Sequence, residues 1–392
     1  MRIAYLCPSI NPVKGGIERV TYILRNYFIA KGHTVYCIAL RQEENKNEED
    51  LIFLPDNCAD HTPGNVTFLN EFLIKNNVDI LIAQLGGPSS GSELAASAPK
   101  SVKKIACLHL DILDSVRHFG ANKYMLLKKM HVGFLAQLFE NNILTDLLVR
   151  LKKHKYQKGY ISLTEQFDKI VLLSDSFIND YEYIAGKHGL MNLTSMPNPL
   201  PFMENIEAAK IIKNKSKTLL YVGRVNTGQK KVDYLLRIWS LLHLKYPNWN
   251  LKIVGDGPDL EMMKRYAHDL ELKNYSFEGY QSPEKYYADA PILCLTSSYE
   301  GFGMVLIEAM RYGVVPVAFD SYASVKDIID DKKNGLLVNP FNLNEYANAL
   351  SMLMTNVEQR ESMAYNSIIK ADTFTISNIG ERWLQLFEKL LH

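Results

Sequence analysis

The chain has 392 residues, of which 47% are hydrophobic and 22% charged, and its 44 basic and 43 acidic side chains leave a net charge of +1. A chain of this length exceeds one ordinary core, so we expect two domains of roughly 150 to 200 residues each. The balanced charge excludes a global field that attracts nucleic acid, and binding to a polyanion or membrane must be local. The five cysteines show no paired spacing and are expected to be reduced. With no signal peptide and no apolar run of about 18 residues, we expect a cytoplasmic protein.

Short apolar runs alternate with longer amphipathic segments, a pattern typical of parallel strands joined by crossover helices. In the first half the expected strands are residues 2–9, 34–40, 77–85, 103–110 and 168–174. In the second half they are residues 218–225, 250–257, 275–280, 291–297 and 314–319. Three prolines in TSMPNPLPFME predict an interdomain linker near residues 196–207. The sequence therefore predicts two α/β sheets, one in each half.

Residues 121–160 interrupt this alternation and are expected to be helical. Eight Lys and Arg residues from Lys123 to Lys158 stand against Glu140 and Asp146. A basic amphipathic helix can lie on an anionic membrane surface, whereas a solvated helical hairpin is the alternative. The membrane hypothesis predicts that neutralising four lysines weakens binding to anionic liposomes: Lys128, Lys129, Lys152 and Lys153.

Three glycine-containing loops follow expected strands. In KGGIERV, residues 14–20, Gly15 and Gly16 permit close backbone approach at a helix N-terminus, where an anion or a sugar hydroxyl can bind. In YVGRVNTGQKK, Arg224 and Lys230 follow a parallel strand and suit a diphosphate, although spacing does not separate Lys230 from Lys231. Each loop could equally be a turn or carry exposed charges.

The loop VGDGPDLE, residues 254–261, has a sufficient structural explanation. Gly255 and Gly257 relax its backbone, and Asp259 is expected to cap the helix that Leu260 opens. A ligand role for this loop depends on its sharing a sheet edge with Arg224.

The stretch SYEGFGMVLIEAM, residues 298–310, combines two acids with a helix start. The helix is expected to begin near Gly303, which places Glu300 in the loop and Glu308 on the second turn. Backbone N–H groups at this N-terminus would cradle an anion, and they belong to Phe302, Gly303, Met304 and Val305. Glu300 could instead be an exposed acid, and Glu308 could make a structural ion pair.

His109 and Asp111 end an expected strand of the first half. A histidine there would face an interdomain cleft and could hydrogen-bond a substrate hydroxyl. The alternative is a satisfied core histidine.

Taken together and in this order, GGIERV, VGRVNTGQKKVDYLL, IVGDGPDLE, SSYEGFGMVLIEAM and GVVPVAF resemble the retaining glycosyltransferases of family 4. The resemblance covers nearly the whole chain and is strongest from about residue 217 to 340. It implies the GT-B fold, in which two Rossmann-like domains with parallel sheets face a cleft. The implied acceptor-binding domain spans residues 1–200 and contains the insert 121–160. The implied nucleotide-sugar-binding domain spans residues 205–372. A C-terminal helix, residues 373–392, would pack back toward the first domain.

The resemblance also implies roles for single residues. Glu300 would contact the donor sugar and Glu308 the nucleotide ribose, while Arg224 and Lys230 would bind the leaving diphosphate. The N-terminal glycine loop falls on Gly16 and the cleft histidine on His109, and the base would lie near Gly279 and Tyr280, with Gly255 among the donor-binding positions.

The sequence contains no D-x-D motif, which agrees with a metal-independent enzyme without a cofactor. The expected reaction moves a sugar with retention from a nucleotide diphosphate sugar, by resemblance a uridine diphosphate sugar, to a glycan or lipid-linked acceptor in cell-surface polysaccharide assembly. Nucleic acid is not an expected partner, and the protein is expected at the inner face of the membrane or free in the cytoplasm. The rival hypotheses are a GT-B epimerase or hydrolase of nucleotide sugars and a non-catalytic nucleotide-sugar-binding protein.

Overall fold

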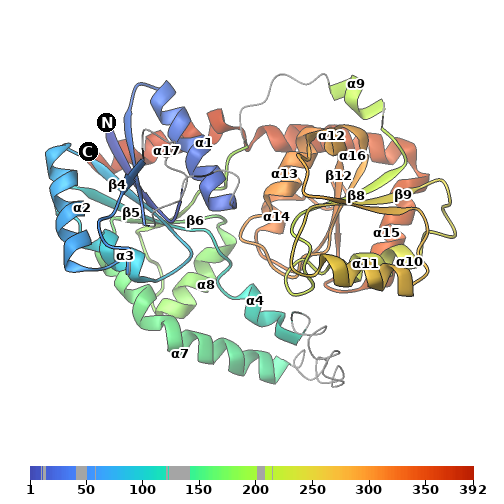
Figure 1. Ribbon diagram of the computed structural model, residues 1–392, viewed down its shortest axis with the longest axis horizontal. Coiled ribbons are helices and arrows are strands. Elements are labelled where there is room, and N and C mark those ends of the chain that lie inside the picture. Colours follow the sequence, from blue (N-terminus) through green and yellow to red (C-terminus); the bar gives the residue numbers. More distant parts are fainter. Residues whose placement is uncertain are drawn as a thin grey trace. The chain divides into compact units, whose positions relative to one another are not determined.

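The computed structural model describes residues 1–9, 11, 15–40, 51–57, 59–120, 122, 142–200, 208–213 and 215–392. The chain folds into two compact units, which Figure 1 shows with their helices and strands. The first unit contains residues 1–110, 150–202 and 374–392, and the second contains residues 111–149 and 203–373.

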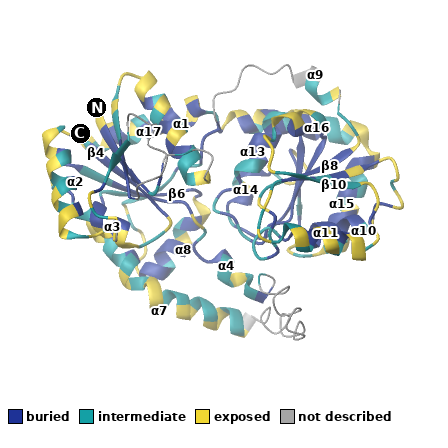
Figure 2. Cartoon of the chain, in the orientation of Figure 1, coloured by how far each residue is buried: buried dark blue, intermediate teal, exposed yellow. Residues whose placement is uncertain are grey.

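A seven-stranded parallel sheet forms the centre of the first unit, in the order β3-β2-β1-β4-β5-β6-β7. Its strands are β1 (Arg2–Cys7), β2 (Thr34–Ala39), β3 (Leu51–Phe53), β4 (Ile80–Leu85), β5 (Lys103–Leu108), β6 (Lys169–Leu172) and β7 (Leu193–Ser195). Every residue of β4 is buried, as Figure 2 shows for the centre of the sheet. A parallel strand buried on both faces needs a nearly continuous apolar run, which explains ILIAQL.

The first unit contains the helices α1 (Gly16–Ala30), α2 (Pro63–Lys75), α3 (Ser90–Ala96), α8 (Ser176–Ala185) and α17 (Ile376–Leu391), together with most of the helix α7 (Asn142–Gln166). Helices α1 and α17 lie side by side, and a Cβ atom on Gly380 would lie 2.2 Å from the Tyr27 ring. The Tyr27 hydroxyl also donates a hydrogen bond of 2.7 Å to Glu381 Oε1. The C-terminal helix therefore packs on the first unit.

A six-stranded parallel sheet forms the centre of the second unit, in the order β10-β9-β8-β11-β12-β13. Its strands are β8 (Thr218–Val222), β9 (Asn250–Val254), β10 (Tyr275–Gly279), β11 (Ile292–Leu295), β12 (Val315–Phe319) and β13 (Leu336–Val338). Helices α10 (Val232–Ser240), α11 (Leu260–Asp269) and α15 (Leu343–Thr355) cover one face. Helices α12 (Glu284–Asp289), α13 (Met304–Arg311) and α16 (Val357–Asp372) cover the other. The short helices α9 (Ala208–Lys213) and α14 (Val325–Ile328) complete this unit.

Each of the ten strand ranges expected from the sequence contains a strand. The sequence analysis missed β3, β7 and β13, which have three residues each and lie at the edges of the sheets. Three residues are too few to show an alternating pattern, and an edge strand buries less apolar surface than a central one. The division into two α/β sheets is confirmed.

Residues 111–120, 122 and 142–149, which the sequence analysis placed in the first domain, group with the second unit in the structure. This stretch includes the short helix α4 (Asp114–Arg117) and the first residues of α7 (Asn142–Gln166), whereas the rest of α7 belongs to the first unit. Residues 121 and 123–141 of the expected insert lie outside the described residues.

Helix α7 exposes a row of apolar and basic side chains. Ile143 is 80% exposed, and Leu147 and Leu151 follow on the same face at intervals of four residues. Exposed Arg150, His154 and Lys158 fall on that face too, and exposed Lys155 lies beside it. In the described parts of the chain, no helix is both long enough and apolar enough to cross a bilayer.

Candidate functional site

The candidate site lies where the strand order of the second sheet reverses. From β8 the chain proceeds outward through β9 to β10, and from β11 it proceeds in the other direction through β12 to β13. Open parallel sheets bind ligands at the carboxyl ends of the two strands that flank this reversal. The loop with Lys230 follows β8 and the loop with Glu300 follows β11, so the topology brings the two motifs together.

Glu300 is the centre of a buried polar network, with its side chain 10% exposed. Its Oε1 atom forms an ion pair with Lys230 Nζ and accepts a hydrogen bond of 2.6 Å from Ser297 Oγ. Gln229 Nε2 donates to Glu300 Oε2 at 3.4 Å and to the Tyr299 carbonyl at 3.1 Å. These donors fix the direction of the Glu300 carboxylate.

Lys230 rather than Lys231 is available to a ligand. Lys231 is fully buried in a left-handed conformation with φ 52°, and its Nζ donates to the Thr227 carbonyl at 3.0 Å. The Lys230 side chain is 16% exposed and reaches Glu300. Asn226 Oδ1 fixes this loop by accepting from the backbone N–H groups of Gln229 and Lys230.

The loop after β9 braces the loop after β8. Gly255 has φ 136°, and a Cβ atom there would lie 1.9 Å from the Gly223 carbonyl oxygen. Asp259 begins α11 but makes no side-chain cap; its Oδ2 accepts instead from the backbone N–H and the hydroxyl of Thr227, at 2.8 and 2.9 Å. The expectation that Asp259 caps the helix is therefore wrong, and the loop holds the strand end that carries Arg224.

Helix α13 begins as expected, with Gly303 at its N-cap in a left-handed conformation with φ 97°. Phe302 is buried, whereas Met304 and Val305 are half-buried, so the N-terminal turn reaches the surface beside Glu300. Glu308 is 6% exposed, and Tyr287 donates a hydrogen bond of 3.1 Å to its Oε2. The alternative of an exposed acid is therefore excluded for Glu300.

Two further candidate residues are exposed at the same edge of the sheet. The Arg224 side chain is exposed, while its carbonyl accepts a hydrogen bond of 2.9 Å from the Tyr221 hydroxyl. Tyr280, directly after β10, is 70% exposed. Both can meet a ligand without displacing packed side chains.

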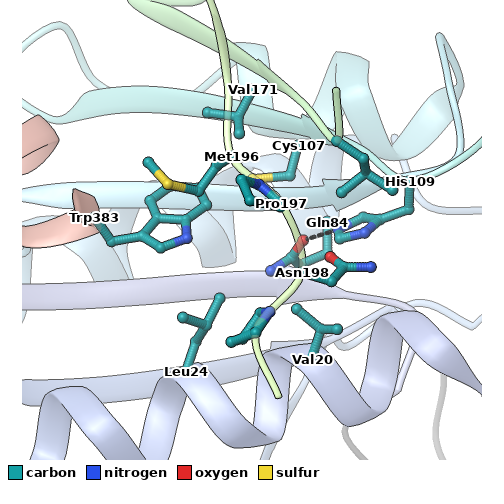
Figure 3. Close-up of a pocket in the computed structure, with 12 residues that line it drawn as sticks. Val20, Leu24, Gln84, Cys107, His109, Val171, Met196, Pro197, Asn198 and Trp383 are labelled. Carbon is teal, nitrogen blue, oxygen red and sulfur yellow. Dashed lines mark hydrogen bonds between the residues drawn. The ribbon is translucent and has the colours of Figure 1, made fainter. Parts of the chain in front are cut away.

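The structure places Gly16 and His109 in the first unit, where they follow β1 and β5. Gly16 is the exposed first residue of α1, and no atom lies within 4 Å of where its Cβ would be. His109 is buried, and its Nε2–H donates to Gln84 Oε1. Figure 3 shows this pair at one end of a cavity of about 10 Å³, which has Trp383 of α17 at the other end.

Such a cavity holds about one water molecule, not a sugar. Its other lining residues are Val20, Leu24, Cys107, Val171, Leu173, Met196, Pro197, Asn198 and Pro199. Burial lowers the pKa of His109 to about 4, so the imidazole is neutral at pH 7. With Nε2–H given to Gln84, Nδ1 is left as the acceptor nitrogen.

His109 makes the stability of the protein sensitive to mild acid. In the unfolded chain the His109 side chain binds a proton below about pH 6.5, whereas in the folded chain it binds one only near pH 4. The stabilising contribution of His109 is therefore complete above about pH 6.5 and is lost as the pH falls toward 4. At about 1.4 kcal/mol per pKa unit, the loss is about 3 kcal/mol. Denaturant unfolding at pH 7 and pH 4 should show this loss for the wild type, and His109→Gln should reduce the difference by that amount. An equal pH dependence in both proteins would contradict a neutral buried His109.

The sequence analysis missed three side chains that hold the predicted ones. Ser297 and Gln229 direct Glu300, and Gln84 holds His109. Ser297 stands in the motif SSYE, three residues before Glu300. A hydroxyl at this spacing from a loop carboxylate could have indicated a hydrogen bond to it. Gln84 gave none, because it stands alone in an apolar strand. Among the described residues, no three His, Cys, Asp or Glu side chains gather into a group that could hold a metal ion.

Comparisons with known proteins agree with this fold. Residues 202–369, which lie almost wholly in the second unit, match the model of the family described as glycosyl transferases group 1. The fold of the chain is GT-B. The pneumococcal O-GlcNAc transferase GtfA, solved in complex with UDP and GlcNAc, superimposes with a TM-score of 0.74 at 12% identity, over 100% of this chain and 99% of that one.

Two curated relatives are also similar in sequence. An uncharacterised glycosyltransferase of Haemophilus influenzae is 34% identical over 226 residues, which cover 57% of this chain and 62% of the relative. The poly(ribitol-phosphate) alpha-N-acetylglucosaminyltransferase of Staphylococcus aureus is 32% identical over 388 residues, which cover 98% of this chain and 64% of the relative. The chain thus spans less than two thirds of the length of either relative.

Proposed function

We propose that this protein is a retaining glycosyltransferase that moves a sugar from a nucleotide diphosphate sugar, with uridine as the base, to a glycan or lipid-linked acceptor of the cell surface. The observation that carries the proposal is the meeting of Lys230, Glu300 and the N-terminus of α13 at the strand-order reversal of the second sheet. The S. aureus relative is named for transfer of N-acetylglucosamine to a polyol phosphate polymer, and the GtfA structure holds UDP. The name of the first supports a glycan-type acceptor at the cell surface, and the ligand of the second supports a uridine diphosphate donor.

The site supplies positive charge where the leaving group would develop negative charge. Lys230 and Arg224 follow the same strand, and the free N–H groups of α13 add the positive end of a helix dipole. Preorganised charge of this kind usually lowers the activation barrier of an enzyme more than any other single effect. With these cations the diphosphate needs no metal ion. Glu300 then orients the donor sugar, and the leaving phosphate takes the proton of the acceptor hydroxyl as the new bond forms on the same face.

The proposal is tested by thermal unfolding with a panel of nucleotide sugars, because a ligand that binds only the folded state raises the Tm. A uridine diphosphate sugar should raise the Tm most, and the same donor should then be consumed only when an acceptor is added, giving a product with the donor's anomeric configuration by NMR. Consumption without acceptor would identify an epimerase or hydrolase. Binding without consumption under any acceptor would identify a non-catalytic sensor.

We further propose that α7 holds the protein at an anionic lipid surface. The exposed row of Ile143, Leu147 and Leu151 offers apolar contact, and Arg150, His154, Lys155 and Lys158 add positive charge on or beside it. Of the lysines chosen in the sequence analysis, Lys128 and Lys129 lie outside the described residues. Lys153 is directed inward, with its Nζ 4.5 Å from the centre of the Tyr183 ring, so the set that faces solvent is a different one.

Replacing Arg150, Lys155 and Lys158 by Gln should weaken binding to vesicles that contain anionic lipid. Each cation near such a surface is worth about 1 kcal/mol, so the triple variant should bind roughly 100-fold more weakly. The matched control replaces Lys75, Lys100 and Lys187, which are exposed on the same unit, and removes equal charge elsewhere. Vesicle sedimentation measures both. Equal binding by the two triple variants would contradict a role for α7.

A further inference from the structure

Residues 111–120 and Asn122, here called the strap, follow β5 and Leu110 in the sequence but pack with the second unit. The strap contacts loops that follow three neighbouring strands of the second sheet, β11, β12 and β13. These loops form the same edge that carries Glu300. Nothing in the sequence of the strap resembles a donor-binding motif, so its position there needs a separate explanation.

The first contact is made by Asp114, which is 4% exposed. Its Oδ2 accepts a hydrogen bond of 3.0 Å from the backbone N–H of Ala323, and its Oδ1 accepts one of 3.0 Å from Arg117. A buried carboxylate is costly unless its oxygens accept hydrogen bonds, and hydrogen bonds to a charged group are stronger than those between neutral groups. Asp114 therefore fixes the loop that follows β12.

The Ala323 loop in turn supports the backbone around Glu300. Ser321 Oγ donates to the Ser297 carbonyl at 2.7 Å, and Ser324 Oγ donates to the Gly301 carbonyl at 3.2 Å. Residues on both sides of Glu300 are thus held by the loop that Asp114 anchors.

The second contact is made by Asn122, whose Oδ1 accepts a hydrogen bond from Ser298 Oγ. Its Nδ2 donates to the Ser115 carbonyl at 2.9 Å, which ties this end of the strap to its start. The Ser298 backbone N–H donates to the Gln229 carbonyl at 2.8 Å. Asn122 therefore lies where the loops of Lys230 and Glu300 meet.

The third contact is made by His118, whose ring meets the Phe341 ring edge to face, with centroids 5.1 Å apart. Phe341 follows β13 and packs on Phe319 and Tyr234 of the second core. Burial lowers the pKa of His118, which favours the neutral ring in this aromatic contact. The three contacts together fix the strap along the edge of the sheet.

We propose that the strap positions the Glu300 loop for sugar transfer, with Asp114 and Asn122 as positioning residues. The proposal rests on the function proposed above. A displacement of a reacting group by about 1 Å can cost about 100-fold in rate, so release of the strap should lower kcat without removing any group that touches the nucleotide.

The test uses the full chain with Asp114→Ala and Asn122→Ala. Asp114→Asn is the rescue variant, since its amide oxygen still accepts from the Ala323 backbone N–H. Arg117→Ala is the matched control, since it removes the exposed partner of Asp114 and leaves the contact with Ala323 in place. Amide hydrogen exchange is measured for residues 297–301 and 321–325. The dissociation constant of UDP is measured by calorimetry. The values of kcat and KM are measured with the donor that the thermal-unfolding screen identifies.

Both alanine variants should exchange roughly tenfold faster in the two segments and lose at least tenfold in kcat, with the UDP dissociation constant and the donor KM changed less than about threefold. Asp114→Asn should recover most of the loss, and Arg117→Ala should stay within about twofold of the wild type. Unchanged exchange in the two segments, or unchanged kcat despite faster exchange, would overturn the proposal. If the wild type transfers no sugar, the proposed function fails, whereas the exchange measurement still decides whether the strap holds the loops.

Discussion

Replacing Glu300 by Ala or Gln is expected to abolish sugar transfer while leaving nucleotide binding largely in place. The carboxylate accepts from Lys230, Ser297 and Gln229, and this network directs it at the position where the donor sugar is expected. Removing one preorganised electrostatic contact from a transferase site costs roughly 100- to 1000-fold in kcat. Glutamine keeps the shape and loses the charge, so a similar loss in both variants would show that the charge is what matters.

The measurement is the initial rate of acceptor-dependent transfer, with UDP affinity measured alongside. Glu358→Gln is the matched control, because Glu358 is an exposed acid of the same unit on α16. Full transfer by Glu300→Ala would mean that the role assigned to Glu300 is wrong. Loss of UDP binding together with transfer would instead indicate that Glu300 holds the β8 loop in place.

Replacing Gly255 by Ala is expected to cause the largest loss of stability. Its φ of 136° lies where side-chain-bearing residues rarely occur, and the new Cβ would lie 1.9 Å from the Gly223 carbonyl oxygen. Backbone strain of about 1–3 kcal/mol and overpacking of about 1–3 kcal/mol together predict a loss of about 2–6 kcal/mol. For a unit of this size each kcal/mol lowers the Tm by about 2–4 °C.

The variant Gly279→Ala, in the same unit, tests the cost of backbone strain without a steric clash. Gly279 also has a positive φ, of 70°, but nothing lies within 4 Å of its Cβ position. Its replacement should cost about 1–2 kcal/mol. Thermal unfolding that shows equal losses for the two variants would contradict the close contact between the loops after β8 and β9.

The sequence predicted that the loops with Lys230 and Glu300 would meet at one edge of the second sheet, because the residues of these loops follow local rules. A strand end, a glycine and a helix start lie within a few positions of one another, and parallel strands bring such loops to one edge. Lys230 and Lys231 could not be separated in this way. The left-handed backbone of Lys231 directs that side chain into the core, and a backbone angle at one loop residue leaves no signature in spacing.

The strap and Asp259 show where local reasoning stops. Residues 111–120 adjoin a strand of the first sheet, so adjacency predicted that they would stay with it, whereas Asp114 and His118 find their partners more than 200 residues further along the chain. Asp259 stands at a helix start and has the chemistry of a cap, but Thr227 offers it two donors instead. Both outcomes depend on tertiary contacts that compete with local preferences.

Calorimetric titration of UDP into the wild type and Lys230→Ala tests the central claim most directly. If the edge formed by β8, β11 and α13 binds the donor diphosphate, the wild type should bind UDP and the variant should bind at least roughly tenfold more weakly, since a charge-assisted contact is worth about 1.5–3 kcal/mol. The Tm of the variant should be measured as well, because Glu300 keeps only its two neutral donors there. Equal affinity of the two folded proteins for UDP would contradict the account.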